Sequence, residues 1–388
     1  MTSLRDKIAI VGIGETEYVR RSPRGAKALI VEAVQKALDD AKIKPEEVDG
    51  IITEGMDTPN LIKDMGLAYT LGLNPRFSAT GPPLGGGNVA SPLLAAMAIT
   101  SGQADVVLTY FSNNFGTRPG IVYGEGLPEV KISSEMPYGC VGTPIWYGMI
   151  ARRYMHEYGL TTRQLASVAV NQRRNAILNG KGIMSNKPLS YEDYENSPMV
   201  ADPLRRPDFC LMNDGACAWV MTSAERAKSC PNKPVYVMGG GLGFMPIGFA
   251  DIGTIRPGHY LHNPDDAVAM ENALKMAGIT RDDLDFAQIY DGYTIHVILF
   301  FEHLGFCKEG EGGAFAESGI TSLEGSLPVN THGGQLSHSY ENAASDMIEA
   351  VRQLRGEAGA CQVKDAKVGM VHGGGGGGHT AVVILRSD

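Results

Sequence analysis

An internal repeat constrains this chain of 388 residues more than any other feature of its sequence. The segment from Ala37 to Asp49 matches the segment from Ala273 to Asp285, in identity or residue class, at one fixed offset. Each copy reads as the end of an amphipathic helix, a short turn and a strand, and an apolar strand precedes each copy. A glycine-rich loop, an apolar helix and another strand follow. Strands that alternate with helices predict an α/β fold, and two such units predict a duplicated one.

The repeat divides the chain into two halves with a long segment between them. We predict a first half formed by residues 1–113 with part of 201–232, an insertion at 114–200, and a second half at 233–388. The insertion is rich in Arg, Tyr, Pro and Met and has little strand pattern. Long insertions of this kind usually cover a functional site rather than build the core.

Composition and charge exclude several classes of function. The formal net charge is −9, so the chain lacks the basic footprint of a nucleic-acid-binding domain. No stretch approaches the roughly 18 uninterrupted apolar residues of a membrane-spanning helix, and the N-terminus shows no signal-peptide pattern. The 6 cysteines form no C-x-x-C pair, so no zinc or thioredoxin-type site is indicated. We therefore expect a cytoplasmic protein with reduced thiols, no metal and no membrane span.

Two glycine motifs invite comparison with dinucleotide-binding loops. Gly12-Ile13-Gly14 and Gly239-Gly240-Gly241-Leu242-Gly243 follow apolar strands, but neither has the complete glycine spacing or the acidic residue of that fingerprint. The sequence also contains no G-x-S-x-G elbow and no P-loop. Nicotinamide and flavin cofactors are therefore not expected.

Three motifs, together with the duplicated halves, resemble the thiolase superfamily. Asn213-Asp214-Gly215-Ala216-Cys217-Ala218 is similar to its S-D-G-A-A-A segment, and the segment from Asn330 to His338 is similar to the one that carries an active-site histidine. His372-Gly373, followed by further glycines, resembles the loop where the sterol-carrier-protein type carries histidine. The resemblance implies an α/β thiolase fold, with duplicated βαβαβαββ halves in a five-layer αβαβα arrangement and a loop insertion.

The chain departs from the thiolase pattern at the positions that carry the chemistry. Where a thiolase has its nucleophilic cysteine, this chain reads Gly85-Gly86-Gly87. The H-D-C-F segment of the sterol-carrier type reads Tyr290-Asp291-Gly292-Tyr293, and Tyr340 stands two residues after His338. These changes resemble the thiolase-like lipid-transfer proteins that act as aldolases on steroid side chains. The resemblance implies that Tyr290 and Tyr340 carry the chemistry.

A pair of phenols suits a reaction without an acyl-enzyme. Acyl transfer needs a thiolate because it passes through a thioester on the enzyme. Retro-aldol cleavage of a β-hydroxyacyl thioester needs a base for the hydroxyl proton, an acid for the enolate carbon and donors for the enolate oxygen. We predict Tyr290 and Tyr340 as base and acid, in an order left open, and His338 as a donor to the enolate oxygen. Phenols are weak acids with a pKa near 10, and we expect oriented donors to lower that value.

Other residues are expected to bind the substrate. Glycines in the runs at 85–87 and 373–378 read as backbone N–H donors that approach a ligand closely. The substrate-binding candidates are therefore Gly85, Gly86, Gly375 and Gly376, together with His372. Asp291 is expected to orient a loop backbone.

The predicted function is that of a coenzyme A-thioester aldolase. It would cleave a β-hydroxyacyl-CoA, with a 17-hydroxy steroid side chain, into a ketone and a short acyl-CoA such as propionyl-CoA. Coenzyme A enters as part of the substrate, and no cofactor is expected. The resemblance also implies a homodimer, with a small zinc-ribbon and OB-fold partner subunit that completes a heterotetramer.

Two other functions stay open at this point. One is a thiolase or acyltransferase that uses a displaced cysteine, for which Cys140 and Cys307 are candidates. The other is a non-catalytic scaffold that binds acyl-CoA or lipid and stabilises a partner.

Overall fold

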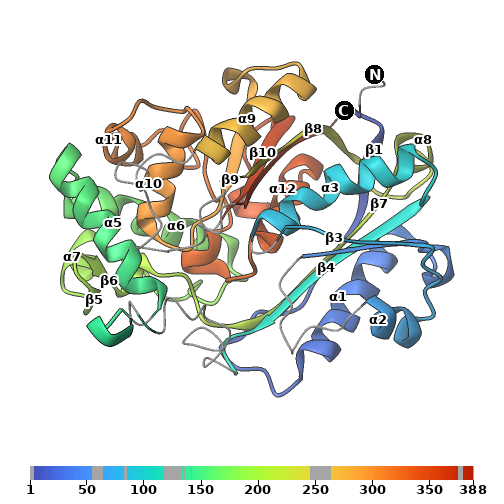
Figure 1. Ribbon diagram of the computed structural model, residues 1–388, viewed down its shortest axis with the longest axis horizontal. Coiled ribbons are helices and arrows are strands. Elements are labelled where there is room, and N and C mark those ends of the chain that lie inside the picture. Colours follow the sequence, from blue (N-terminus) through green and yellow to red (C-terminus); the bar gives the residue numbers. More distant parts are fainter. Residues whose placement is uncertain are drawn as a thin grey trace.

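One mixed sheet runs through the computed structural model, which describes residues 4–54, 64–82, 85–117, 133, 136–140, 142–244, 264–374 and 379–387. Within these residues the strand order is β3-β2-β4-β7-β1-β8-β11-β10-β9 (Figure 1). The strands are β1 (Ile8–Glu15), β2 (Gly50–Thr53), β3 (Phe77–Thr80), β4 (Val106–Asn114), β7 (Asp214–Ser223), β8 (Val235–Phe244), β9 (Phe286–Ile289), β10 (Val368–Gly373) and β11 (His379–Arg386). The second half repeats the first in mirror order, so that β8, β9, β10 and β11 correspond to β1, β2, β4 and β7.

Strand directions also repeat between the halves. β2 runs parallel to β3 and β4, and β7 runs antiparallel to β4 and β1. In the second half β10 runs parallel to β9, and β11 runs antiparallel to β10 and β8. The halves join where β1 pairs with β8. The counterpart of β3 is a single parallel bridge between Ala287 and Val329. The predicted duplication is confirmed, with this one strand reduced to a bridge.

The helices form three layers around the two halves of the sheet (Figure 1). α1 (Ala26–Ala41) and α2 (Asp64–Leu71) cover the outer face of the first half. α9 (Pro264–Ala277), with α10 (Thr294–His303) beside it, covers the outer face of the second half. α3 (Gly85–Thr100) and α12 (Ala344–Arg355) lie between the halves, contact strands of both and touch each other. The result is the predicted five-layer arrangement. No helix in the described ranges is long and apolar enough to cross a bilayer.

Glycines in β1 and β8 let the outer helices pack directly on the sheet. A Cβ at Gly12 would lie 2.2 Å from the carbonyl oxygen of Ala37, and one at Gly239 would lie 2.3 Å from that of Ala273. Ala37 and Ala273 are equivalent positions of the sequence repeat, so both halves build the same strand–helix contact. The glycines of these two motifs therefore allow the outer helices to pack closely on strands β1 and β8.

The described residues between β4 and β7 form a largely helical unit. Its elements are α5 (Thr143–Tyr158), α6 (Thr162–Asn179), α7 (Tyr191–Glu195), β5 (Met199–Ala201) and β6 (Leu204–Arg205). The side chain of Thr161 caps the start of α6, and Gly180, with a φ of 73°, ends it. α6 packs on α11 (Gly312–Glu317) and on a π-helical turn at Gly334–His338, while α5 packs on α10. This unit thus lies against the loops that follow β9 and precede α12.

Candidate active site

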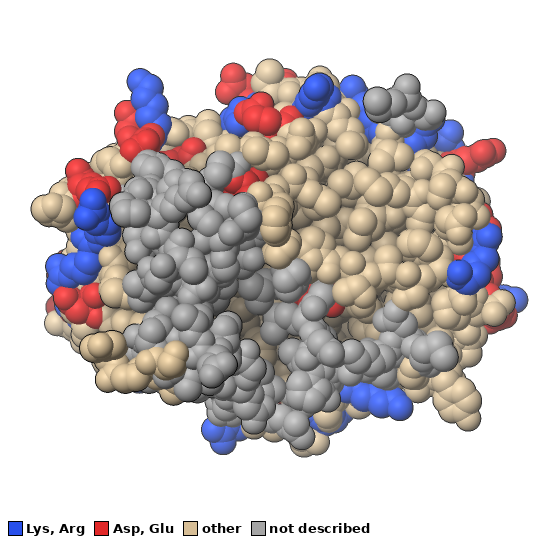
Figure 2. Space-filling view, in the orientation of Figure 1, with Lys and Arg blue, Asp and Glu red and all other residues tan. Residues whose placement is uncertain are grey.

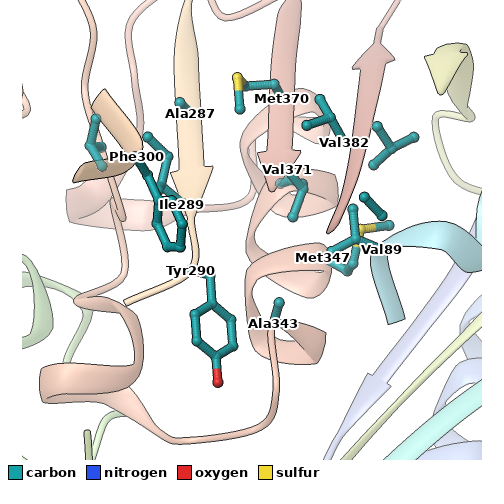
Figure 3. Packing of buried hydrophobic residues seen from close by; sticks show 14 of the residues in the cluster. Val89, Ala287, Ile289, Tyr290, Phe300, Ala343, Met347, Met370, Val371 and Val382 are labelled. Carbon is teal, nitrogen blue, oxygen red and sulfur yellow. The ribbon is translucent and has the colours of Figure 1, made fainter. Parts of the chain in front are cut away.

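The structure brings together the two tyrosines that the sequence singles out. Tyr290 directly follows β9, and Tyr340 follows the π-helical turn that ends at His338. Their hydroxyl oxygens lie 3.3 Å apart and share a hydrogen bond. Tyr290 is buried and Tyr340 is half-buried. Figure 3 shows Tyr290 beyond the end of β9, with its hydroxyl directed away from the packed apolar side chains.

Gly85, the first residue of α3, makes room for the ring of Tyr290. A Cβ at Gly85 would lie 2.7 Å from two carbons of that ring, a separation that real side chains do not adopt. Gly86 is similarly confined, with its Cβ position 3.0 Å from the carbonyl oxygen of His379. The phenol ring therefore occupies space that a side chain at position 85 would need. The other two glycine candidates, Gly375 and Gly376, lie outside the described residues.

Asp291 connects the loop of Tyr290 to the loop of Tyr340. Its two carboxylate oxygens accept hydrogen bonds from the backbone N–H groups of Gln335 (2.8 Å) and Leu336 (3.1 Å), in the π-helical turn. The carboxylate is fully buried. Gly334 adjoins it so closely that a Cβ there would lie 2.2 Å from Oδ2 of Asp291. Asp291 therefore orients a loop backbone, as predicted.

Two asparagines of the first half hold the backbone of Tyr340. The side-chain oxygen of Asn213 accepts a hydrogen bond from the Tyr340 N–H at 2.7 Å, and the Asn113 amide donates to the Tyr340 carbonyl. The Asn213 amide also donates to buried Glu341 at 2.8 Å. Asn113 is the penultimate residue of β4, and Asn213 immediately precedes β7. The strands of the first half thus position a phenol of the second half.

The imidazole of His338 contacts the rings of Tyr18 and His332. Its ring centroid is 5.1 Å from that of Tyr18 and 4.6 Å from that of His332, and its Nδ1 lies 3.0 Å from the Ser339 hydroxyl. Burial lowers the pKa of His338 to about 3, so the imidazole is uncharged. Its predicted part as a donor to the substrate stays a prediction.

His372 is engaged by a buried carboxylate of α9. Its Nε2 lies 3.1 Å from Oδ1 of Asp266, whose Oδ2 lies 3.1 Å from Nδ1 of His303. Thr380 donates to the same carboxylate at 2.7 Å. Although burial alone would raise it, hydrogen bonds from His303 and His372 hold the pKa of Asp266 below its usual range. Substrate binding by His372 stays a prediction.

Burial raises the pKa of both phenols, whereas the sequence interpretation expected a lowered value. Desolvation is the main cause for Tyr290 and for Tyr340, with neighbouring thiol and phenol groups adding to it. Each phenol therefore stays protonated at neutral pH. A protonated phenol accepts a proton only as it passes its own proton on, and the shared hydrogen bond provides that path. The pair suits a proton relay better than a standing phenolate.

The thiol of Cys210, which sequence reasoning did not connect with the site, affects both phenols. The Cys210 N–H donates to the Gly292 carbonyl at 3.0 Å, and its thiol contributes to the raised pKa of both phenols. Burial raises the pKa of Cys210 to about 12, and that of Cys307 also to about 12. Reactive thiols have lowered pKa values instead, so neither is prepared as a nucleophile. Cys140 is half-buried just before α5.

Asn113 and Cys210 had no signal of their own in the sequence. Asn113 lies in a strand of the first half, and Cys210 in an irregular stretch before the motif at Asn213. The one indication was that Cys210 lies just before the motif that begins at Asn213, which resembles a thiolase segment.

Comparison with known proteins agrees with this fold. The family model for the thiolase N-terminal domain matches residues 8–225, and the model described as thiolase C-terminal domain-like matches residues 264–387. The chain therefore belongs to the thiolase superfamily.

Individual relatives narrow this assignment to one branch. The 17-hydroxy-3-oxo-4-pregnene-20-carboxyl-CoA lyase of Mycobacterium tuberculosis is 36% identical over 363 residues, which cover 91% of this chain and 92% of the relative. A steroid side-chain-cleaving aldolase of Thermomonospora curvata is 34% identical over 92% of both chains. A solved structure described as an Ltp2-ChsH2(DUF35) aldolase matches with a TM-score of 0.92 and 33% identity, over 100% of this chain and 99% of that chain. The resemblance to steroid side-chain aldolases is confirmed.

Proposed function

We propose that this protein is a carbon–carbon lyase that cleaves a β-hydroxyacyl-CoA, with a 17-hydroxy steroid side chain, by a retro-aldol reaction. The observation that carries the proposal is the 3.3 Å contact between the hydroxyls of Tyr290 and Tyr340. This contact lies beside Gly85, where the ring of Tyr290 leaves no room for a nucleophilic side chain. The relative that is 36% identical bears the name of a lyase for a 17-hydroxy steroid carboxyl-CoA, and the one that is 34% identical bears the name of a steroid side-chain-cleaving aldolase.

The phenol pair balances the protons of this reaction. One phenol accepts the proton of the β-hydroxyl as the carbon–carbon bond breaks and the ketone forms. The electron pair of that bond moves onto the thioester, which becomes an enolate. As the first phenol takes up this proton, it passes its own proton along the shared hydrogen bond to the second phenol, which gives its proton to the enolate carbon and completes the short acyl-CoA. Both phenols are protonated again when the reaction ends.

This chemistry requires no metal, redox cofactor or acyl-enzyme. Electrons stay within the substrate, and coenzyme A enters only as the thioester part of it. Because the pKa of each phenol is raised, we expect the proton to move along the pair without a lasting phenolate at either residue. Among substrate-binding candidates, Gly85 and Gly86 have first-turn N–H groups that α3 itself leaves unpaired, next to Tyr290. Gly375, Gly376, His372 and His338 remain candidates from the resemblance.

The proposal includes assembly with partners. β3 lies at the edge of the sheet, and Figure 2 shows few charged side chains over the region of α3 and the adjoining first-half strands. An uncharged face beside the edge strand of a sheet suits a homodimer. The similar structure is described as a complex with a second component, ChsH2(DUF35). A small zinc-ribbon and OB-fold subunit is the partner we propose, in a heterotetramer. The 6 free cysteines suit a reducing cytoplasm.

A product assay tests the proposal. The chain, co-expressed with its partner subunit, should convert a 17-hydroxy steroid acyl-CoA into the 17-ketone and propionyl-CoA. Tyr290→Phe and Tyr340→Phe should each lower kcat by about 10²–10⁴, the usual contribution of a proton-transfer group. Tyr293→Phe is the matched control, because it removes a neighbouring phenol hydroxyl that has no part in the relay.

Each alternative function has its own outcome in this assay. Activity that survives both substitutions within a few-fold would refute the phenol mechanism. A loss of activity with intact dimer and partner binding would exclude the non-catalytic scaffold.

A further inference from the structure

The imidazole of His296 is buried beside Tyr290. His296 lies in the first turn of α10 and is 4% exposed. Its ring centroid lies 6.0 Å from that of Tyr290, 5.1 Å from that of Tyr293, and 4.1 Å from that of Tyr147, which stands perpendicular to it. Within the described residues neither ring nitrogen has a hydrogen-bond partner.

An unpaired imidazole in such a place is costly. A buried polar group without a partner destabilises a protein, so each such group in a native protein calls for an explanation, of which a catalytic role is one. Burial also lowers the pKa of His296 to about 3, so the ring is uncharged. A neutral imidazole carries one N–H donor and one acceptor nitrogen.

Each of the other two imidazoles considered for this site has a partner at one of its ring nitrogens, whereas His296 has a partner at neither within the described residues. His338 pairs with the hydroxyl of Ser339, and His372 pairs with Asp266. His296 instead faces the Tyr290 ring across Gly292. A Cβ at Gly292 would lie 3.1 Å from Cε1 of Tyr290 and 3.3 Å from Nδ1 of His296. The glycine therefore leaves an imidazole nitrogen and the edge of a phenol ring next to each other, without a side chain between them.

We propose that His296 donates its N–H to the thioester oxygen on which the enolate charge forms. This inference rests on the proposed aldolase function. When the carbon–carbon bond breaks, its electron pair moves toward that oxygen, and the hydrogen bond to His296 strengthens as the charge grows. The proton stays on the imidazole, so the proton exchange between the phenols is unchanged. A fixed donor in a buried site stabilises developing charge far better than water does.

The experiment uses the complete complex with its partner subunit and measures two reactions. One is cleavage of the steroid acyl-CoA. The other is exchange of the α-hydrogens of propionyl-CoA in D₂O, followed by mass spectrometry, which needs the enolate but no carbon–carbon cleavage. The variants are His296→Phe, which has no donor, and His296→Gln, which keeps an N–H. Tyr293→Phe is the control for disturbance of the same aromatic cluster.

We expect His296→Phe to lower kcat for cleavage and the exchange rate together, by about 10²–10³, the usual effect of one lost donor to an oxyanion. KM should stay within about threefold, His296→Gln should recover roughly a tenth or more of the lost rate, and Tyr293→Phe should resemble the wild type. If His296→Phe does not fold, His296→Met supplies the variant without a donor.

Cleavage that falls while exchange persists, or two rates that both persist, would overturn the assignment of His296. A wild-type complex that neither cleaves the steroid thioester nor exchanges propionyl-CoA would instead refute the proposed function itself. The two failures are therefore distinguishable.

Discussion

The ring of Tyr290 and a side chain at Gly85 are mutually exclusive. The Cβ position of Gly85 is 2.7 Å from two ring carbons of Tyr290, and both residues are buried, so neither can move away freely. A side chain at position 85 and this phenol therefore cannot occupy the site together.

Gly85→Ala should consequently impair catalysis. The added methyl displaces the Tyr290 ring from Tyr340, so we expect kcat to fall at least tenfold and stability to fall by about 1–3 kcal/mol from overpacking. Steady-state kinetics and urea denaturation measure these effects. Gly25→Ala is the control, since a Cβ at Gly25 meets nothing within 4 Å and its φ is −73°. Equal behaviour of the two variants would contradict the steric argument.

The two phenols should act as one unit. Because each needs the other to complete the relay, the double variant Tyr290→Phe/Tyr340→Phe should lose about as much kcat as the worse single variant. Independent contributions would instead multiply. A double-mutant cycle on kcat decides between these results, and multiplied losses would show that the phenols do not share a proton path.

Cys210 should be dispensable. Its pKa of about 12 keeps the thiol protonated at neutral pH, so Cys210→Ala should retain kcat within about threefold. Iodoacetamide should likewise leave the activity of the wild type largely intact, with Cys210→Ala as the reference for steric effects of the label. A loss of several orders of magnitude in Cys210→Ala would revive the displaced-cysteine mechanism.

Asp291→Asn should lower activity because it displaces the loop that carries Tyr340, and not because Asp291 transfers a proton. Both oxygens of Asp291 accept backbone N–H bonds at Gln335 and Leu336, and an amide replaces one acceptor with a donor. We expect kcat to fall about 10-fold to 100-fold with the phenol pair chemically intact. Asp291→Glu, which keeps both acceptors, is the comparison. An Asn variant with wild-type kcat would show that this clamp is unimportant.

Asp208 should make stability depend on pH. Tyr194 and Thr294 donate to this buried carboxylate, and burial raises its pKa to about 6. The unfolded value is about 3.9, so the folded state binds this proton more tightly. The stabilisation is complete below pH about 4 and is lost as pH rises to about 6, by up to about 3 kcal/mol.

Urea denaturation across this pH range measures the effect. Asp208→Asn should show a smaller decline of the free energy of unfolding with pH than the wild type, whatever its absolute stability. A variant with an unchanged slope would show that other buried acids account for the dependence.

The fold and the family were accessible from local patterns in the sequence. The match of Ala37–Asp49 with Ala273–Asp285 predicted the duplication, because each copy encodes the same helix, turn and strand. Gly12 and Gly239 support equivalent helices, since they face the carbonyls of Ala37 and Ala273, which are equivalent positions of the repeat. The tyrosines were found because the register of the family motifs assigns Tyr290 and Tyr340 to loops at one end of the sheet.

Only the tertiary packing decided which side chains surround Tyr290 and Tyr340. Asn113, Cys210 and His296 come from a strand, an irregular stretch and a helix, and no motif in the sequence connects them to Tyr290 or Tyr340. His338 was placed by motif, yet its ring contacts are with Tyr18 and His332. The raised pKa of the phenols arises from desolvation, which depends on everything packed around them. Periodicity and motifs determine which elements form, whereas side-chain contacts and protonation follow from how distant elements enclose one another.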